Sequence, residues 1–274
     1  MAVSKHSDLV FDVGMHRGED TDFYLKKGFR VIGIEANPAL CEECAERFAS
    51  EIQANQLTIV NSAVAEIDGE IDFYLNPGRS VWGTADPAWV ERNEKQGQQS
   101  IKTRVVARPF SSLIQQYGVP YYLKIDIEGF DHLCLSGLIG FDHIPEHVSV
   151  ESSATDQADT MYQLSLMHDL GYKRFKLVPQ HDVNKQRCPR PAREGNEIDY
   201  SFPNGSSGLF GEEAPGDWMS YDAIRSEYEK IYRQVALVGP HTGRFRNIQN
   251  RYVRGVLNRL FWRGLGWYDT HASI

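Results

Sequence analysis

The stretch FDVGMHRGED (residues 11–20) decides the fold. An apolar run that contains one acidic residue, Asp12, leads into a turn with Gly14 and Gly18, and a helix-forming segment follows. This order predicts a buried strand that turns directly into a helix, the first unit of an α/β sheet. Glycine lets a ligand approach the backbone closely, and the start of a helix offers unpaired N–H groups. The stretch therefore predicts a ligand site at this turn, although a tight turn without a ligand would look the same.

The spacing of the two glycines argues against a dinucleotide. They form GxxxG, whereas dinucleotide-binding turns have GxGxxG. Asp12 suits a cationic ligand that has an amine and a sulfonium rather than a pyrophosphate. Glu35 ends the next apolar run, VIGIEANP, where a carboxylate accepts hydrogen bonds from ribose hydroxyls, and Ser62 and Ala63 end the third run, where an adenine ring would lie. Together these residues predict S-adenosylmethionine as the cofactor.

Outward from this stretch, short apolar runs alternate with amphipathic segments from residue 9 to residue 171. This alternation is typical of βαβ units and predicts an α/β fold with a doubly wound, mostly parallel sheet of about five or six strands. The predicted strands are residues 9–14, 30–36, 57–64, 70–75, 121–127 and 147–152. The predicted helices are residues 18–28, 39–55, 110–118 and 130–138.

A segment rich in glycine and proline, residues 76–109, interrupts the alternation and predicts an insertion or a lid. Within it, Ser80, Trp82 and Thr84 place an aromatic surface beside two hydroxyls, which would suit a sugar ring in a substrate. A tryptophan that merely packs under the lid explains the same residues.

The C-terminal third has a different composition. Residues 179–220 are rich in Pro, Gly, Ser and Asn, and a loop of this length is usually functional. A helix is predicted at 220–239, and the basic, aromatic tail after it predicts a helix packed on the body or on a second subunit, with a membrane or nucleic-acid contact as the alternative. We expect a cofactor-binding domain at 1–178, and a loop and helical C-terminal extension at 179–274 packed on it.

The composition limits the classes of function. The 274 residues are 41% hydrophobic, which suffices for a full core, and the net charge of −8 argues against a nucleic-acid partner. No apolar run approaches 18 residues and the N-terminus lacks a signal-peptide layout, so we expect a cytoplasmic protein without a membrane span. Cys41 and Cys44 form a CxxC inside a predicted helix, but no second ligand pair at a matching spacing indicates a zinc site.

Three segments, FDVGMHRGEDTDFYLKKG, VIGIEANP and YYLKIDIEGFD, resemble the FkbM-type branch of class I S-adenosylmethionine-dependent methyltransferases over roughly residues 8–175. The resemblance implies a Rossmann-like methyltransferase fold. It also implies roles for individual residues. Asp12, Gly14, Gly18 and Thr21 would hold the methionine moiety, Glu35 and Ala36 the ribose, and Ser62 and Ala63 the adenine edge. His16 and Arg17 depart from the small or amide residues of the family, so their roles stay open.

The segment LKIDIEGFDH (123–132) contains the candidates for chemistry. Asp126 and Glu128 follow a core strand at the edge where doubly wound folds bind ligands. The family's base position is occupied by Gly129, so the base does not carry over. Candidates for a general base are Glu128, His132 and, in the later loop, His181, among which geometry decides.

Glu151 ends the next strand at the same edge. Metal-dependent O-methyltransferases place carboxylates in this way, so Asp126 and Glu151 could hold Mg²⁺ against substrate hydroxyls. The alternative is that Asp126 contacts the amino-acid end of the cofactor and Glu151 caps a turn or pairs with an arginine.

These features predict an S-adenosylmethionine-dependent O-methyltransferase that acts on a hydroxyl of a sugar, a glycan or a similar polar metabolite. Two alternatives stay open. One is an N-methyltransferase that acts on a small amine or a protein side chain, and the other is a non-catalytic nucleotide-binding domain.

Overall fold

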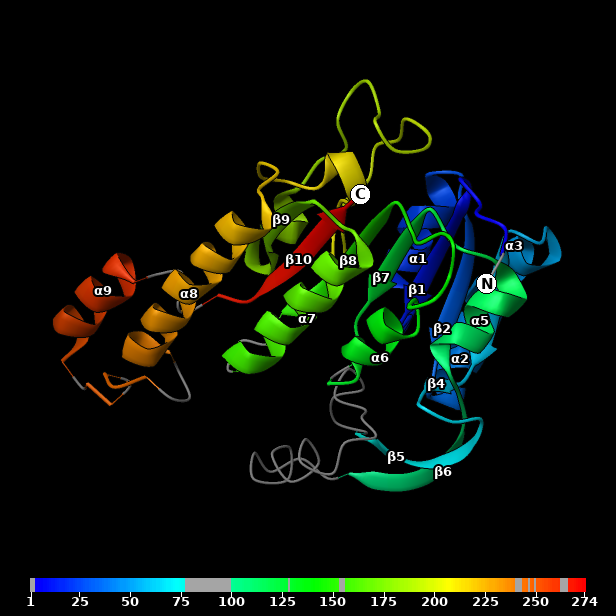
Figure 1. Ribbon diagram of the computed structural model, residues 1–274, viewed down its shortest axis with the longest axis horizontal. Coiled ribbons are helices and arrows are strands. Elements are labelled where there is room, and N and C mark those ends of the chain that lie inside the picture. The colour runs from blue at the N-terminus through cyan, green and yellow to red at the C-terminus, as the bar shows by residue number, and fades with distance from the viewer. Residues whose placement is uncertain are drawn as a thin grey trace.

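The structure is a computed structural model of the chain, drawn in Figure 1. It describes residues 3–76, 100–127, 129–152, 156–239, 243–245, 247–248, 250–261 and 266–274. Four residues for which the sequence predicts a role lie outside the described residues: Ser80, Trp82, Thr84 and Glu128.

A seven-stranded sheet forms the centre, in the order β3-β2-β1-β7-β8-β10-β9. Its strands are β1 (Leu9–Val13), β2 (Arg30–Glu35), β3 (Leu57–Asn61), β7 (Tyr122–Ile125), β8 (His147–Ser152), β9 (Arg174–Pro179) and β10 (Tyr268–Ser273). Strands β3, β2, β1, β7 and β8 pair in parallel, and β10 pairs antiparallel with β8 and β9. The predicted doubly wound, mostly parallel α/β fold is confirmed.

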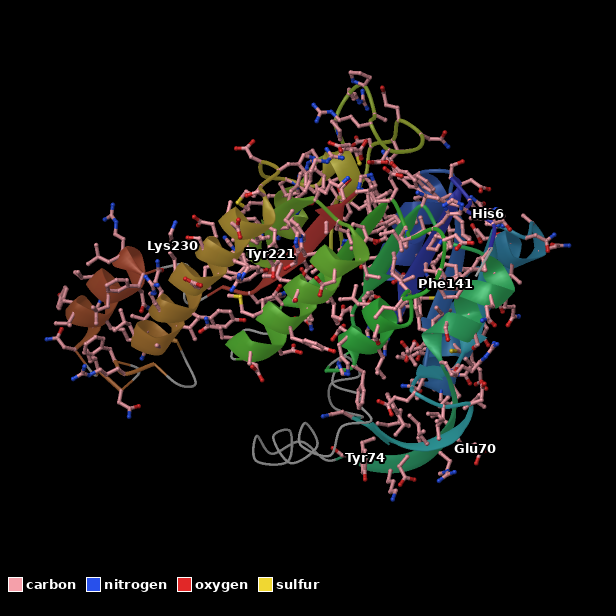
Figure 2. All side chains as sticks on the ribbon, viewed as in Figure 1. His6, Glu70, Tyr74, Phe141, Tyr221 and Lys230 are labelled. Atoms are coloured by element: carbon pink, nitrogen blue, oxygen red, sulfur yellow. The ribbon has the colours of Figure 1, made fainter. Side chains whose placement is uncertain are left out.

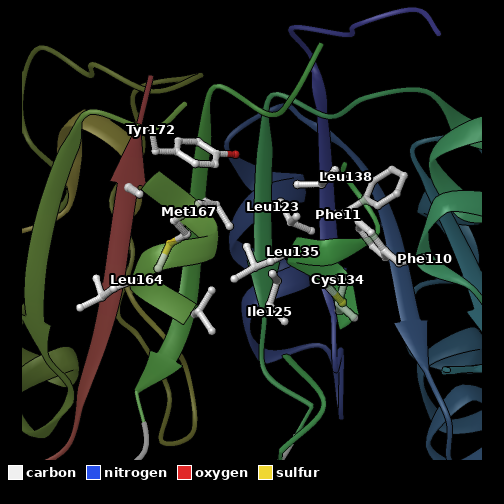
Figure 3. Close-up of a cluster of buried hydrophobic side chains, with 14 of the residues drawn as sticks. Phe11, Phe110, Leu123, Ile125, Cys134, Leu135, Leu138, Leu164, Met167 and Tyr172 are labelled. Atoms are coloured by element: carbon white, nitrogen blue, oxygen red, sulfur yellow. The ribbon is translucent and has the colours of Figure 1, made fainter. Parts of the chain in front are cut away.

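Helices cover both faces of this sheet (Figure 1). They are α1 (Glu19–Lys26), α2 (Pro38–Arg47), α3 (Ala49–Gln53), α5 (Phe110–Tyr117), α6 (Asp131–Ser136) and α7 (Gln157–Leu170). On one face Phe11 and Leu123 pack with Phe110, Leu135 and Met167 from α5, α6 and α7 (Figure 3). Every second residue of a strand points to the same face, which is why Val10 and Tyr122 instead pack toward α1.

The predicted helix at 220–239 is confirmed as α8 (Tyr221–Val238), where the Ser220 side chain accepts a hydrogen bond from the Ala223 N–H as an N-cap. The other elements of the C-terminal third are the short 3₁₀ helices η2 (Gln180–Lys185) and η3 (Gly211–Glu213) and the helix α9 (Arg251–Leu260). Of the helices that the structure describes, none combines the length and apolarity needed to cross a bilayer.

Two predicted elements are divided in the structure. The run 57–64 breaks at Ser62 into β3 and β4 (Ala63–Val64), and the predicted helix 39–55 is interrupted at Phe48 between α2 and α3. Phe48 has a non-helical backbone and is buried beside the Gly18 turn. Packing of this aromatic ring against the glycine turn therefore overrides the helical composition of the segment.

The run 70–75 lies outside the central sheet, contrary to the prediction. It forms β5 (Gly69–Leu75), which pairs antiparallel with β6 (Ile101–Arg108), and β6 also pairs with β4 in a separate three-stranded sheet. Residues 101–108, which the sequence assigned to the insertion, are therefore a strand. Side chains of β6 alternate, with Val105 and Ala107 buried and Val106 exposed, as expected for a strand with one solvated face.

The C-terminus also differs from the predicted helical extension, because residues 268–273 form β10 inside the central sheet. The long loop that precedes α8 packs against α1 through a buried ion pair between Lys27 Nζ and Glu213 Oε1, 3.0 Å apart. The same Glu213 oxygen accepts hydrogen bonds from the N–H groups of Arg193 and Glu194. These contacts hold the loop over the face of the sheet that α1 covers.

Candidate functional site

A cavity of about 770 Å³ opens at the carboxyl ends of the parallel strands, the edge at which doubly wound folds bind ligands. Its walls come from four parts of the chain. The strand ends contribute Gly14, Glu35, Ala36, Ser62, Ala63, Asp126 and Glu151, η2 contributes Gln180, His181, Val183 and Asn184, the long loop contributes residues 203–207, and the C-terminal segment contributes Trp267 and Asp269. The structure thus brings six of the nine residues predicted to bind the cofactor to one cavity.

The glycine turn has a structural cause that the sequence did not show. Gly14 has a φ of 81°, and a Cβ atom there would collide with the carbonyl oxygen of Asp126 at the end of β7. Gly18 has a φ of 75°, and a Cβ there would collide with the Phe48 ring. Both glycines are therefore required by close packing within the protein. Gly14 lies on the cavity wall as well, whereas Gly18 does not.

Asp12 lies behind the turn and is fully buried, so it does not line the cavity. Its Oδ2 accepts a hydrogen bond of 2.6 Å from Thr21 Oγ1, and its Oδ1 lies 3.2 Å from Lys124 Nζ. Thr21 is also fully buried and absent from the cavity wall. The position of both residues indicates that they stabilise the turn.

Lys124 is a buried cation that the sequence analysis overlooked. Its Nζ donates to the Gly14 carbonyl at 3.0 Å and lies within 4.0 Å of carboxylate oxygens of Asp12, Asp20 and Asp126. Burial lowers the pKa of Lys124, but the attraction of these carboxylates outweighs it and raises the pKa well above its usual value. The sequence did contain an indication of this buried cation, because Lys124 is a charged residue within the apolar run YYLKIDI.

Glu35 is held in place by the backbone around it. Its Oε2 accepts the N–H of His16 at 2.9 Å and its Oε1 accepts the N–H of Asn37 at 2.8 Å. Burial raises the pKa of Glu35, while these two hydrogen bonds oppose the rise. His16 has a φ of 51°, which orients its N–H toward Glu35, and its ring Nδ1 lies 3.0 Å from Glu19 Oε1. The Glu35 carboxylate therefore has a fixed orientation at the cavity wall.

Asp269, on β10, is directly opposite Glu151 of β8 and lines the cavity, although the sequence analysis did not select it. Its side chain is only 6% exposed, and none of the hydrogen bonds or ion pairs between described residues engages its carboxyl group. Burial, followed by the negative charge of Asp126, raises the pKa of Asp269 well above its usual value. A buried carboxyl group that no other described side chain pairs with thus lines the cavity.

The two histidines predicted as bases are in different surroundings. His181 lines the cavity and is about half exposed, and its Nε2 lies 3.2 Å from Asp182 Oδ2. His132, on α6, does not line the cavity, and its ring lies between those of Phe130 and Tyr162. The structure thus brings His181, but not His132, to the candidate site.

The long loop contributes a wall of the cavity at Pro203–Ser207, as its length suggested, but the sequence did not indicate which residues. Buried Asp20 accepts the N–H of Ser207 and holds this wall, and burial raises the pKa of Asp20 to about 7. Ser206 lines the cavity, and its buried hydroxyl has no hydrogen-bond partner among the residues that the structure describes. Such a group is suited to contact with a polar ligand.

Asp126 and Glu151, the predicted Mg²⁺ ligands, both lie on the cavity wall. Among the residues that the structure describes, no three or more histidine, cysteine, aspartate or glutamate side chains are grouped so as to hold a metal ion. The thiols of Cys41 and Cys44 are free and buried, and burial raises the pKa of each to about 12. Both thiols therefore stay protonated at neutral pH.

Comparison with known proteins gives one family match. A family model described as the methyltransferase FkbM domain matches residues 12–174, more than half of the chain. No curated protein matches. Similar solved structures include a precorrin-6y C5,15-methyltransferase from Geobacter metallireducens GS-15, with 8% identity, 98% of this chain and 81% of that chain covered, and a TM-score of 0.40.

A second similar structure is a SAM-dependent methyltransferase from Archaeoglobus fulgidus. The identity is 12%, the match covers 98% of this chain and 87% of that chain, and the TM-score is 0.39. A third, from Thiobacillus denitrificans, is a SAM-dependent methyltransferase in complex with S-adenosyl-L-homocysteine. The identity is 9%, the match covers 98% of this chain and 85% of that chain, and the TM-score is 0.35.

Proposed function

Since the chain belongs to the FkbM methyltransferase family and is thus an S-adenosylmethionine-dependent methyltransferase, we propose that its methyl acceptor is a hydroxyl of a sugar or a similar polar metabolite. The observation that carries this proposal is the buried Asp269 carboxyl group on the cavity wall, which has no ion-pair or hydrogen-bond partner among the described residues. A hydroxyl must lose its proton as it is methylated, and the ionised form of this group can accept it.

Lining residues at the ends of β1, β2, β3 and β7, with Phe73 of β5, would bind the cofactor. The fixed Glu35 carboxylate would accept hydrogen bonds from the ribose hydroxyls. Ser62 and Ala63, together with the Phe73 ring, would contact the adenine, and Gly14 and Asp126 would contact the methionine end. When bound, the cofactor supplies a methyl group activated by its bond to a sulfonium.

Of the acidic and basic groups in the cavity, Asp269 is the best proton acceptor. Asp126 already has an ion-pair partner, because its Oδ2 lies 3.6 Å from Lys124 Nζ. His181 is about half exposed and its Nε2 lies 3.2 Å from Asp182 Oδ2, whereas Asp269 is buried. Asp269 has no cation at ion-pair distance among the described residues, and burial raises its pKa well above its usual value, which makes its ionised form a stronger base than an ordinary aspartate.

The remaining lining supports a polar acceptor. Gln180 and Asn184 offer side-chain amides, Ser206 lines the same wall, and Trp267 offers a ring on which the apolar face of a sugar can pack. An amine acceptor fits less well. A neutral amine attacks the methyl group without a general base, so a buried carboxyl group such as Asp269 would have no role in the transfer.

Incubation with methyl-labelled S-adenosylmethionine and a panel of monosaccharides, nucleotide sugars and small amines tests the proposed acceptor class. We expect label on a sugar hydroxyl, identified as a methyl ether by mass spectrometry and NMR. Transfer to the amines alone would replace the proposal with N-methylation.

Replacing Glu35 with alanine should weaken binding of S-adenosylhomocysteine by about 1–3 kcal/mol, because charged hydrogen bonds to the ribose would be lost. Isothermal titration calorimetry measures the change. Glu42→Ala, an exposed position on the adjacent helix α2, is the matched control and should bind as the wild type does. An unchanged affinity for the Glu35 variant would show that the ribose lies elsewhere.

Removal of divalent cations tests whether Mg²⁺ assists the transfer. If Asp126 and Glu151 hold Mg²⁺ against the acceptor, dialysis against EDTA abolishes methyl transfer and added Mg²⁺ restores it. Activity that persists unchanged in EDTA rejects the metal and leaves proton transfer to Asp269 as the full requirement. Calorimetry with S-adenosylhomocysteine in the same buffers separates an effect on the acceptor from an effect on the cofactor.

A further inference from the structure

The helix α9 exposes an apolar surface that the rest of the described chain does not cover. In the view of Figure 1 it lies at the end of the molecule opposite α3, and its side chains extend around it (Figure 2). None of its residues is buried, and Tyr252 and Leu260 are 76% and 65% exposed. Four of its apolar side chains are among the exposed large hydrophobic residues of the protein: Tyr252, Val253, Val256 and Leu260.

The exposed residues of α9 are sorted onto two faces. With about 100° between successive residues, Tyr252, Val253, Val256, Leu257 and Leu260 share one half of the helix surface. The opposite half is polar and contains three arginines. Arg254 and Arg259 lie at the two borders between the halves, and Arg251 lies between them on the polar half.

The charge around α9 has a single sign. The whole chain has a net charge of −8, yet no aspartate or glutamate occurs between Glu229 and Asp269. The segment from Arg244 to Arg263 contains six arginines. The helix therefore presents a cationic surface on an acidic protein.

We propose that α9 binds the surface of an anionic phospholipid bilayer, with its apolar half inserted between the headgroups. A helix with a wide apolar half, a basic polar half and no acidic residue lies in the plane of a membrane interface. Arginines at the borders can extend their aliphatic stems along the apolar side and contact lipid phosphates with their guanidinium groups. The arrangement of Arg254 and Arg259 meets this requirement.

The charge distribution favours a membrane over a second copy of the chain. If two copies of α9 packed through their apolar halves, the arginines at the borders would face one another, with no acidic residue in the surrounding segment to pair with them. An anionic bilayer supplies the complementary charge for all of these arginines.

Co-sedimentation of the full-length protein with vesicles tests the proposal. We expect binding to vesicles of phosphatidylcholine with about one-third phosphatidylglycerol, little binding to phosphatidylcholine alone, and weaker binding in high salt because the Debye length falls. Leu260→Asp should reduce the bound fraction at least about ten-fold, since it places a charge in the inserted half. Ile139→Asp is the matched control, because Ile139 is similarly exposed, at 61%, but lies after α6.

Two results would overturn the proposal. One is absence of binding to the anionic vesicles at low salt, with circular dichroism showing a folded protein. The other is a dimer in analytical ultracentrifugation that Leu260→Asp dissociates and Ile139→Asp does not, which would assign α9 to contact between two copies. Cofactor binding plays no part in either measurement, so both outcomes are independent of the proposed methyl acceptor.

Discussion

Replacing Asp269 with asparagine should lower the rate of methyl transfer about 10²- to 10⁴-fold, the range expected for loss of a general base. Asparagine keeps the size and hydrogen-bonding shape of the side chain but cannot accept the proton. The affinity for S-adenosylhomocysteine should stay at the wild-type value, because Asp269 lies on β10, away from Glu35 and the Gly14 turn. Steady-state kinetics on the methylated acceptor and calorimetry on the product measure the two quantities separately.

The pH dependence gives a second readout for Asp269. Burial and the negative charges of Asp126, Asp20 and Asp131 raise its pKa, while Lys124 lowers it. Glu151 of β8 and His181 of η2 also line the cavity with it. Because a base must be ionised, the wild-type rate should rise with pH through a pKa above that of an ordinary aspartate, and the variant should lack this rise.

Asp169→Asn is a matched control for this experiment, since Asp169 is exposed on α7 and remote from the cavity wall. It should retain the wild-type rate and pH profile. A rate for Asp269→Asn within about three-fold of wild type, with the acidic limb unchanged, would contradict its role as the base. His181→Gln would then be the next variant to compare.

Replacing Lys124 with methionine should lower the free energy of unfolding by about 3–5 kcal/mol, as expected when one member of a buried ionic cluster is removed. Methionine fills a similar volume but leaves Asp12, Asp20 and Asp126 without their shared cation. The Gly14 carbonyl also loses its hydrogen bond from the Lys124 ammonium. Urea unfolding followed by circular dichroism measures the change, and cofactor affinity should fall with it because the Gly14 turn loosens.

The loss of stability in Lys124→Met should depend on pH. The pKa of Asp20 is raised to about 7 in the folded protein, so the folded state binds a proton more readily than the unfolded state. Its contribution to stability therefore decreases as pH rises from about 4 to about 7, and removal of Lys124 raises the folded pKa further. The loss of unfolding free energy in Lys124→Met, relative to wild type, should thus be smaller at pH 5 than at pH 7.

Lys26→Met is the control for this variant. Lys26 is exposed on α1 and pairs with Asp22 at the surface, where an ion pair contributes about 0–1 kcal/mol. Equal stability losses for the two lysine variants would show that the Lys124 cluster is not a buried structural element.

The glycine turn and the apolar runs made much of the fold predictable. The alternation of apolar and amphipathic segments located β1, β2, β7 and β8, because a strand buried on both faces needs a continuous apolar run. The same logic placed Gly14, Glu35, Ser62 and Asp126 at the carboxyl ends of strands, and the structure gathers these four around one cavity.

The predictions failed where a segment depends on distant partners. Residues 268–273, YDTHAS, are mostly polar, yet they form β10 because β8 and β9 supply hydrogen bonds on both sides. Asp12 was predicted to face the ligand, but Lys124, the residue beside it on β7, binds it inside the sheet. Neither pairing leaves a local pattern in the sequence.

The sequence by itself determined the family, the doubly wound sheet and the strand ends that line the cavity, because those features depend on short segments whose apolar pattern and glycines act locally. Only the tertiary structure decided which charged groups lie close together. Lys124 lies among Asp12, Asp20 and Asp126, and Asp269, near the C-terminal end, lies opposite Glu151. The pairing of strands far apart in the chain sets these neighbours, and burial among them sets each group's pKa and therefore its chemistry.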